Sequence, residues 1–135
     1  MPRSPTRMRN LLTFAIAVSA LAFAQTPAPT QVTWTGWFGD AGCSAGRFSK
    51  PTVTPPNPEC ARKCIQEGAT GVFLSEQARA VFKVTGYPSL VDDLGYRVEV
   101  TARVDEATKT ISVQSVKRIS DYEGAACARP SPKKP

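Results

Sequence analysis

The chain has 135 residues, of which 17 are Lys or Arg and 11 are Asp or Glu, and it contains no histidine. Without a histidine to serve as base, thiol-protease chemistry is excluded in its usual form. The net charge falls from +6 to +3 if the arginine-rich N-terminal segment is removed, and basic residues of the C-terminal tail carry most of the remainder. A nucleic-acid partner is therefore not expected.

Residues 1–24 have the pattern of a secretory signal peptide. Three arginines precede an apolar run from Leu11 to Phe23, and small residues on either side of Phe23 mark a cleavage site before Gln25. The apolar run is shorter than the roughly 20 residues needed to cross a bilayer, so we expect no membrane span after cleavage. The predicted location is secreted or periplasmic, where disulfide bonds form.

The remaining sequence divides into one domain with two polar ends. Residues 25–30 form a predicted flexible N-terminal segment and residues 120–135 a C-terminal tail, both rich in Pro, Ala, Ser or Lys. Residues 31–119 suit one small domain. The hydrophobic core of so small a domain gives limited stability, so a covalent cross-link would stabilise it further.

The first predicted element is a strand from Gln31 to Gly39, rich in β-branched and aromatic residues. Its alternation places one set of side chains on one face (Val32, Trp34, Phe38) and a second set on the other (Thr33, Thr35, Trp37). From Asp40 to Pro56, frequent Gly, Ser and Pro predict a long irregular loop.

A helix of about ten residues follows, bracketed by its end signals. Asn57 is a predicted N-cap, Pro58 suits the first helical position, and Gly68 can end the helix. Cys60 and Cys64 then lie one turn apart on the same helix face.

The second half of the domain reads as four strands. Two short apolar runs, 71–75 and 80–84, predict a hairpin, and Pro88 indicates a turn with a helical turn after it. Strict alternation over 96–104 predicts a half-buried strand. The last strand, 110–119, changes phase as a β-bulge near Gln114 or Ser115 would produce.

These elements predict a mainly β fold. Five strands and one short helix after the first strand favour a small five-stranded OB-like barrel. The alternative is an open antiparallel sheet with the helix across one face.

Three runs, WTGWFGDAGC, ECARKCIQEGATGVFLSE and VEVTARVDEATKTISVQSV, resemble a family of small exported bacterial proteins of uncharacterised function, and the resemblance is compatible with an OB-like fold. The family pattern is Gly-Trp-Ile-Ser-Asp-x-x-Cys-Gly, then Cys-Ala-x-Lys-Cys, then Gly-Ala-x-x-Val-Phe. The matching positions here are Gly36, Trp37, Asp40, Cys43, Cys60, Ala61, Lys63, Cys64, Gly68, Ala69, Val72 and Phe73. This chain lacks the histidine that members often place before the paired cysteines, and it adds Cys127. The resemblance implies no established activity.

The four cysteines, Cys43, Cys60, Cys64 and Cys127, are disulfide candidates in an exported chain. Two thiols at i and i+4 on one helix have poor geometry for a bond to each other. We therefore expect Cys43 to reach Cys60 or Cys64, and Cys127 to take the remaining helix thiol. Closing a loop of about 20 residues is worth roughly 3 kcal/mol.

Two other interpretations of the cysteines remain open. A Zn or Cu(I) site could use Cys43, Cys60, Cys64 and either Asp40 or Cys127. A reactive thiol could use Cys60 at the helix start, beside positively charged residues. The spacing is not that of a compact metal knuckle or a Cys-x-x-Cys redox pair, so we predict no cofactor.

The remaining function class is binding. Adjacent carboxylates, Asp92-Asp93 and Asp105-Glu106, are typical of turns, so an enzyme is not expected. A binding surface on the barrel could include Trp37, Tyr87, Arg97 and Arg103, whereas five other aromatic residues are expected in the core (Trp34, Phe38, Phe73, Phe82, Tyr96). The sequence thus predicts a non-enzymatic, disulfide-stapled module with a binding or envelope-associated role and an unknown partner.

Overall fold

The structure is a computed structural model that describes residue 25 and residues 27–124. This part of the chain contains the strands β1 (Thr30–Asp40), β2 (Gly71–Ser75), β3 (Ala80–Thr85), β4 (Val98–Asp105) and β5 (Thr110–Arg118), the helices α1 (Ala41–Ser44) and α2 (Pro58–Gln66), and the 3-10 helix η1 (Pro88–Asp93). The predicted signal peptide and Cys127 lie outside the described residues.

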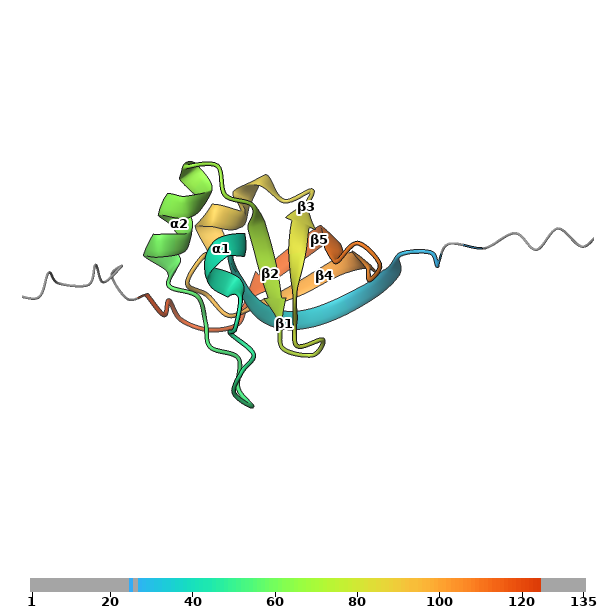
Figure 1. The fold of residues 1–135 in the computed structure, drawn as a ribbon, viewed down its shortest axis with the longest axis horizontal. Helices are drawn as coiled ribbons and strands as arrows, with labels where there is room; N and C mark the ends of the chain where they lie inside the picture. Colours follow the sequence, from blue (N-terminus) through green and yellow to red (C-terminus); the bar gives the residue numbers. More distant parts are fainter. Residues whose placement is uncertain (1–24, 26, 125–135) are drawn as a thin grey trace, which may run out of the picture.

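The five strands form a closed barrel in the order β1-β2-β3-β5-β4. β3 and β5 are parallel, and the other neighbours are antiparallel. Figure 1 shows the strands wrapped into the barrel, with the helices gathered at one end. The closed barrel confirms the predicted mainly β fold and its favoured architecture, a small five-stranded barrel, and it excludes the alternative, an open sheet.

The barrel closes because β1 pairs with two partners. Residues 30–36 pair with β4, whereas residues 36–40 pair with β2, so Gly36 belongs to both ladders. At this corner the backbones approach so closely that a Cβ on Gly36 would lie 1.9 Å from the carbonyl oxygen of Leu74. Glycine is required there by close approach of a neighbouring backbone.

Alternating side chains fill the barrel. On β4 the predicted alternation is confirmed, because Val98, Val100, Ala102 and Val104 are all buried. They pack with side chains from the other strands and the helical segments (Phe38, Phe73, Phe82, Leu90, Leu94, Ile111). The predicted bulge in β5 is also confirmed: Thr101 pairs with Ser115 but Ala102 pairs with Val113, which leaves Gln114 unpaired.

The capping signals of α2 act as expected. The Asn57 side chain accepts hydrogen bonds from the backbone N–H groups of Glu59 and Cys60, and Gly68 adopts a φ of 101° after the helix. The prediction of an irregular loop from Asp40 onward was wrong at its start. Asp40 ends β1 and its carboxylate accepts from the Cys43 N–H, so the short helix α1 follows at once.

Candidate functional site

A second apolar cluster lies outside the barrel core, on the outer face of β1, β2 and β3. Trp37 and Leu74 pair across β1 and β2, and Val72 and Val81 lie on the same face. Trp37 is 7% exposed. Because side chains alternate along a strand, this face is opposite the one that carries Phe73 into the barrel. We call these four residues the Trp37 face.

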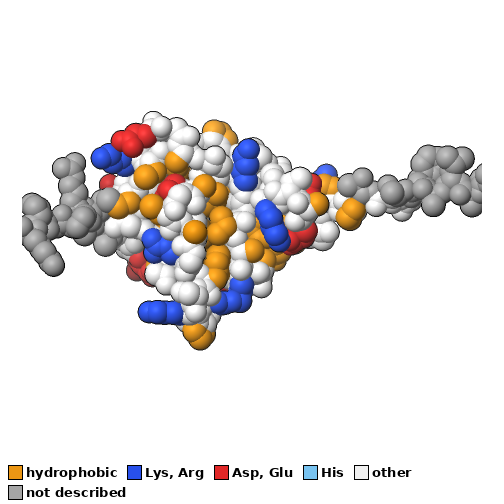
Figure 2. All heavy atoms as spheres, in the orientation of Figure 1, with side chains coloured by type: hydrophobic (Ala, Val, Ile, Leu, Met, Phe, Trp, Pro, Cys, Tyr) orange, Lys and Arg blue, Asp and Glu red, His pale blue; other side chains and the backbone are white. Residues whose placement is uncertain are grey.

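The chain between α1 and α2, residues 45–57, covers the Trp37 face. Phe48 and Val53 pack against the cluster. Pro56 lies over Gly39, where an added Cβ would be 2.9 Å from the proline Cγ. Figure 1 shows this segment extending from α1 beyond the barrel before it returns to α2. Figure 2 shows a band of hydrophobic side chains over β2 on the same view of the molecule. We call residues 45–57 the covering loop.

Arginine hydrogen bonds fasten the covering loop. Arg79, in the β2–β3 turn, donates from Nη2 to the carbonyls of Phe48 and Lys50 and from Nη1 to that of Pro51, each at 2.7 Å. Arg47 donates to the carbonyls of Cys43 and Pro55, each at 3.0 Å. The Arg79 bonds are exposed to solvent, so each contributes only modestly to stability.

The Trp37 face contains an unused hydrogen-bond donor. The indole N–H of Trp37 is buried and contacts no acceptor among the described residues. A buried donor without a partner costs about 1–3 kcal/mol. An oxygen atom of a ligand that entered between the covering loop and the sheet would recover that cost.

Cys43, Cys60 and Cys64 lie at the end of the barrel that carries α1 and α2. Cys43, on α1, is exposed and Cys64, on α2, is half-buried, and both are free thiols. The predicted bridge from Cys43 to the helix is therefore not formed in this structure. Cys60 is half-buried on α2, one turn before Cys64.

Asp40 dominates the electrostatics of this end. It is 2% exposed; one carboxylate oxygen accepts from the Cys43 N–H, and the other has no partner among the described residues. The charge of Asp40 raises the pKa of the Cys43 thiol, with burial and the charge of Cys64 adding to the effect. Across residue 25 and residues 27–124, no three His, Cys, Asp or Glu side chains are grouped closely enough to hold a metal ion.

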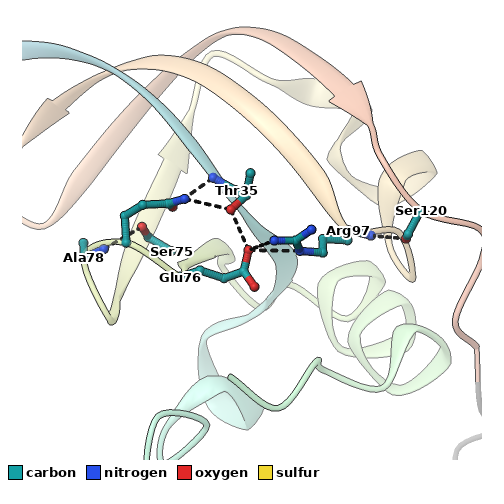
Figure 3. Close-up of polar contacts among 7 residues, drawn as sticks. Thr35, Ser75, Glu76, Ala78, Arg97 and Ser120 are labelled. Carbon is teal, nitrogen blue, oxygen red and sulfur yellow. Dashed lines mark hydrogen bonds and ion pairs between the residues drawn. The ribbon is translucent and has the colours of Figure 1, made fainter. Parts of the chain in front are cut away.

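A polar network occupies the corner where β1 changes partner (Figure 3). One carboxylate oxygen of Glu76 accepts from Arg97 Nη2 at 2.7 Å, from Arg97 Nε at 3.0 Å and from the Thr35 hydroxyl at 2.5 Å. Gln77 adds hydrogen bonds to the Thr35 backbone and hydroxyl. Arg97, a predicted binding residue, is thus part of a network that links β1, β2 and β4.

The structure does not bring the four predicted binding residues together. Tyr87 stacks on Phe38 with ring centroids 5.6 Å apart, and its hydroxyl donates to the buried Asp93. Arg103 is exposed on β4, opposite Gln31. Only Trp37 belongs to the covered face. Sequence reasoning missed the covering loop and Arg79, although isolated apolar residues in a Gly-, Ser- and Pro-rich segment were a usable signal.

Comparison with protein-family models, curated proteins and solved structures finds no match to this chain. The resemblance to a family of exported proteins therefore stays a prediction. In the part of the chain that the structure describes, no helix is long and apolar enough to cross a membrane.

Proposed function

We propose that this chain is an exported, non-enzymatic β-barrel module, stapled by disulfide bonds, that binds an oligosaccharide of the cell envelope at the Trp37 face. The observation that carries the proposal is the buried indole N–H of Trp37, which has no acceptor among the described residues. Saccharides offer ring faces that pack on an aromatic side chain and oxygens that accept from an indole. OB-like barrels also use their outer strand face for such ligands.

The covering loop can move away from the Trp37 face while the barrel stays closed. The Trp37 face forms a cluster separate from the barrel core, so the core stays packed when the covering loop moves. The loop gives up the packing of Phe48, Val53 and Pro56, the solvent-exposed hydrogen bonds of Arg79 and the bond from Arg47 to the Cys43 carbonyl. Lifting it is therefore far cheaper than unfolding, and a ligand can replace what it contributes.

The charge distribution favours a neutral ligand. Removal of the predicted signal peptide would leave a net charge of +3, and three basic residues lie in the tail (Arg129, Lys133, Lys134). The folded part is thus nearly neutral and offers little long-range attraction for a polyanion. Apolar packing and hydrogen bonds would supply the affinity.

The competing function is a thiol- or metal-handling protein that uses Cys43, Cys60 and Cys64. The free thiols of Cys43 and Cys64 favour it, and Cys43 lies next to the buried Asp40. Cys60 weighs against it, because this residue is disulfide-bonded. The raised pKa of Cys43 weighs against it, because thiolate is the form that attacks disulfides and binds metals. Counting free thiols and bound metal in protein taken directly from its native compartment separates the two functions.

The proposal is tested by expressing the full chain with its own N-terminus in a bacterial host. Intact mass should show a protein that begins at Gln25, recovered outside the cytoplasm. That protein should sediment with insoluble peptidoglycan more than with membrane vesicles. Retention of Met1 would contradict export, and equal recovery with and without peptidoglycan would contradict binding.

Two matched variants locate the binding site. Trp37→Phe keeps an aromatic ring but removes the N–H, and we expect about tenfold weaker retention, which corresponds to about 1.4 kcal/mol. Trp34→Phe changes the half-buried tryptophan that packs against Phe82 inside the barrel, and it should bind as the native chain does. Equal weakening by both variants would show that the Trp37 face is not the site.

A further inference from the structure

Backbone hydrogen bonds hold the helix that carries Cys43 next to the last turn of the helix that carries Cys64. Ala41, the first residue of α1, donates its N–H to the carbonyl of Thr70 at 3.0 Å. Ala69, next to Thr70, donates to the carbonyl of Cys64 at 2.9 Å. Asp40, which caps α1, pairs with Gly71 across β1 and β2. The two cysteine-bearing segments are therefore fixed relative to each other.

The side chains agree with this placement. Both thiols are free, Cys43 is exposed and Cys64 is half-buried. The charge of Cys64 is one of the causes that raise the pKa of Cys43, which agrees with the proximity of the two segments that the backbone hydrogen bonds establish. Cys60 lies four residues earlier in α2, about 6 Å further along the helix axis from the last turn. Cys64 is thus the helix cysteine in the turn that lies next to α1, and Cys60 is already disulfide-bonded.

We propose that Cys43 and Cys64 form a disulfide bond in the exported protein. This inference rests on the proposed export, because an oxidising compartment must supply the oxidant, a disulfide-carrying oxidoreductase or a small disulfide such as glutathione disulfide. One thiolate attacks the oxidant to give a mixed disulfide and releases one thiol. The second cysteine then displaces the other thiol. Two electrons and two protons pass from the cysteines to the oxidant, which leaves as two thiols.

The bond would close a ring of chain that contains the covering loop. Cys43 precedes residues 45–57 and Cys64 follows them, so both ends of the loop would be fixed while its middle is held by Arg79. The middle of the covering loop could then move away from the Trp37 face while α1 and α2 keep their positions. The raised pKa of Cys43 fits a bond that exchanges slowly and serves as architecture.

The pairing can be read from a tryptic map without reduction. Cleavage after Arg47, Arg62, Lys63 and Arg79 places Cys43, Cys60 and Cys64 on separate peptides, and Cys127 lies on a fourth. We expect the peptide that ends at Arg47 to be joined to peptide 64–79. A link from Cys43 to peptide 48–62, or to the peptide that contains Cys127, would overturn the inference.

Two serine variants serve as controls, and oxidation in vitro separates the pairing from export. Cys60→Ser should keep Cys43 protected from alkylation, whereas Cys64→Ser should leave it labelled. Purified reduced protein treated with glutathione disulfide should form the same link whether or not the cell exported it. If the chain retains Met1 but forms this link in vitro, the result contradicts the proposed export and supports the proposed Cys43–Cys64 bond. If the chain is exported but Cys43 and Cys64 can both still be alkylated after oxidation, the result contradicts the proposed bond and supports the proposed export.

Discussion

Gly36 and Leu74 are in backbone contact at the corner where β1 exchanges β4 for β2, and a Cβ on Gly36 would lie 1.9 Å from the Leu74 carbonyl oxygen. A carbonyl held in a ladder cannot move away as a flexible side chain can. The barrel therefore tolerates no side chain at this position.

Gly36→Ala should lower the free energy of unfolding by about 3 kcal/mol or more, because the added methyl separates β1 from β2. Chemical denaturation followed by circular dichroism measures the loss. Gly46→Ala is the control: Gly46 has a φ of 78° but no atom within 4 Å of an added Cβ, so only backbone strain opposes it, at about 1 kcal/mol. Equal losses in the two variants would contradict the steric role of Gly36.

Arg79→Ala should release the covering loop while the barrel stays folded. The variant loses three hydrogen bonds to loop carbonyls, which are exposed and worth about 1 kcal/mol in total at most after solvent screening. Amide hydrogen exchange should therefore accelerate within residues 48–54 and stay unchanged in β4. Arg103→Ala, on the exposed face of β4, is the control and should leave loop exchange as it is. Slow loop exchange in Arg79→Ala would show that apolar packing alone holds the cover.

Glu76 should make the fold sensitive to acid. Burial tends to raise the pKa of Glu76, but hydrogen bonds from Arg97 and Thr35 and the charge of Arg97 outweigh it and lower the pKa overall. A carboxyl whose folded pKa lies below its unfolded pKa stabilises the fold at higher pH, and that contribution is lost as pH falls below about 4.3.

Glu76→Gln measures this contribution. At neutral pH the variant should be less stable by about 1 kcal/mol, a small value because the ion pair is partly exposed. Thermal unfolding between neutral pH and pH of about 3 should show the two proteins converging as Glu76 becomes protonated. A constant difference across that range would mean that the carboxylate charge contributes nothing.

Tyr87 should ionise at a higher pH than an ordinary tyrosine does. Burial, together with its hydrogen bond to Asp93 and the charge of Asp93, raises the pKa of Tyr87 to about 12. Because the folded pKa exceeds the unfolded value of about 10, this residue stabilises the fold below pH of about 10 and the contribution disappears as pH rises towards 12. Phenolate absorbance should show a late titration step that Tyr87→Phe removes. A late step that persists in the variant would assign it to another tyrosine.

Local signals were sufficient to predict most elements of the barrel. The alternation of Val98 to Val104 specified β4 and its buried face. The change of phase in the last strand predicted a bulge near Gln114 or Ser115, and the structure has it at Gln114. Asn57, Pro58 and Gly68 specified the ends of α2 because capping depends on neighbouring residues only. Each of these features is encoded within about ten residues of sequence.

The candidate site could not be predicted in the same way, because it depends on contacts between distant segments. Alternation placed Trp37 on the face opposite Trp34, and the structure agrees, but Phe48 and Val53 then bury that face. No periodic pattern in the sequence predicts that the covering loop folds back onto the sheet. Arg79 lies more than two dozen residues from the carbonyls it holds, and the pairing of Glu76 with Arg97 likewise arises only when the barrel closes.

The most direct test of the account is the fluorescence of Trp37 in the Trp34→Phe variant, which leaves Trp37 as the single tryptophan. Soluble peptidoglycan fragments should change its emission in a saturable way, because the ligand replaces the covering loop and accepts the indole N–H. Arg79→Ala in the same background should saturate at lower fragment concentration, since the cover is already loosened. Emission that stays unchanged across the titration, in a protein shown to be folded, would contradict the claim that the Trp37 face is a binding site.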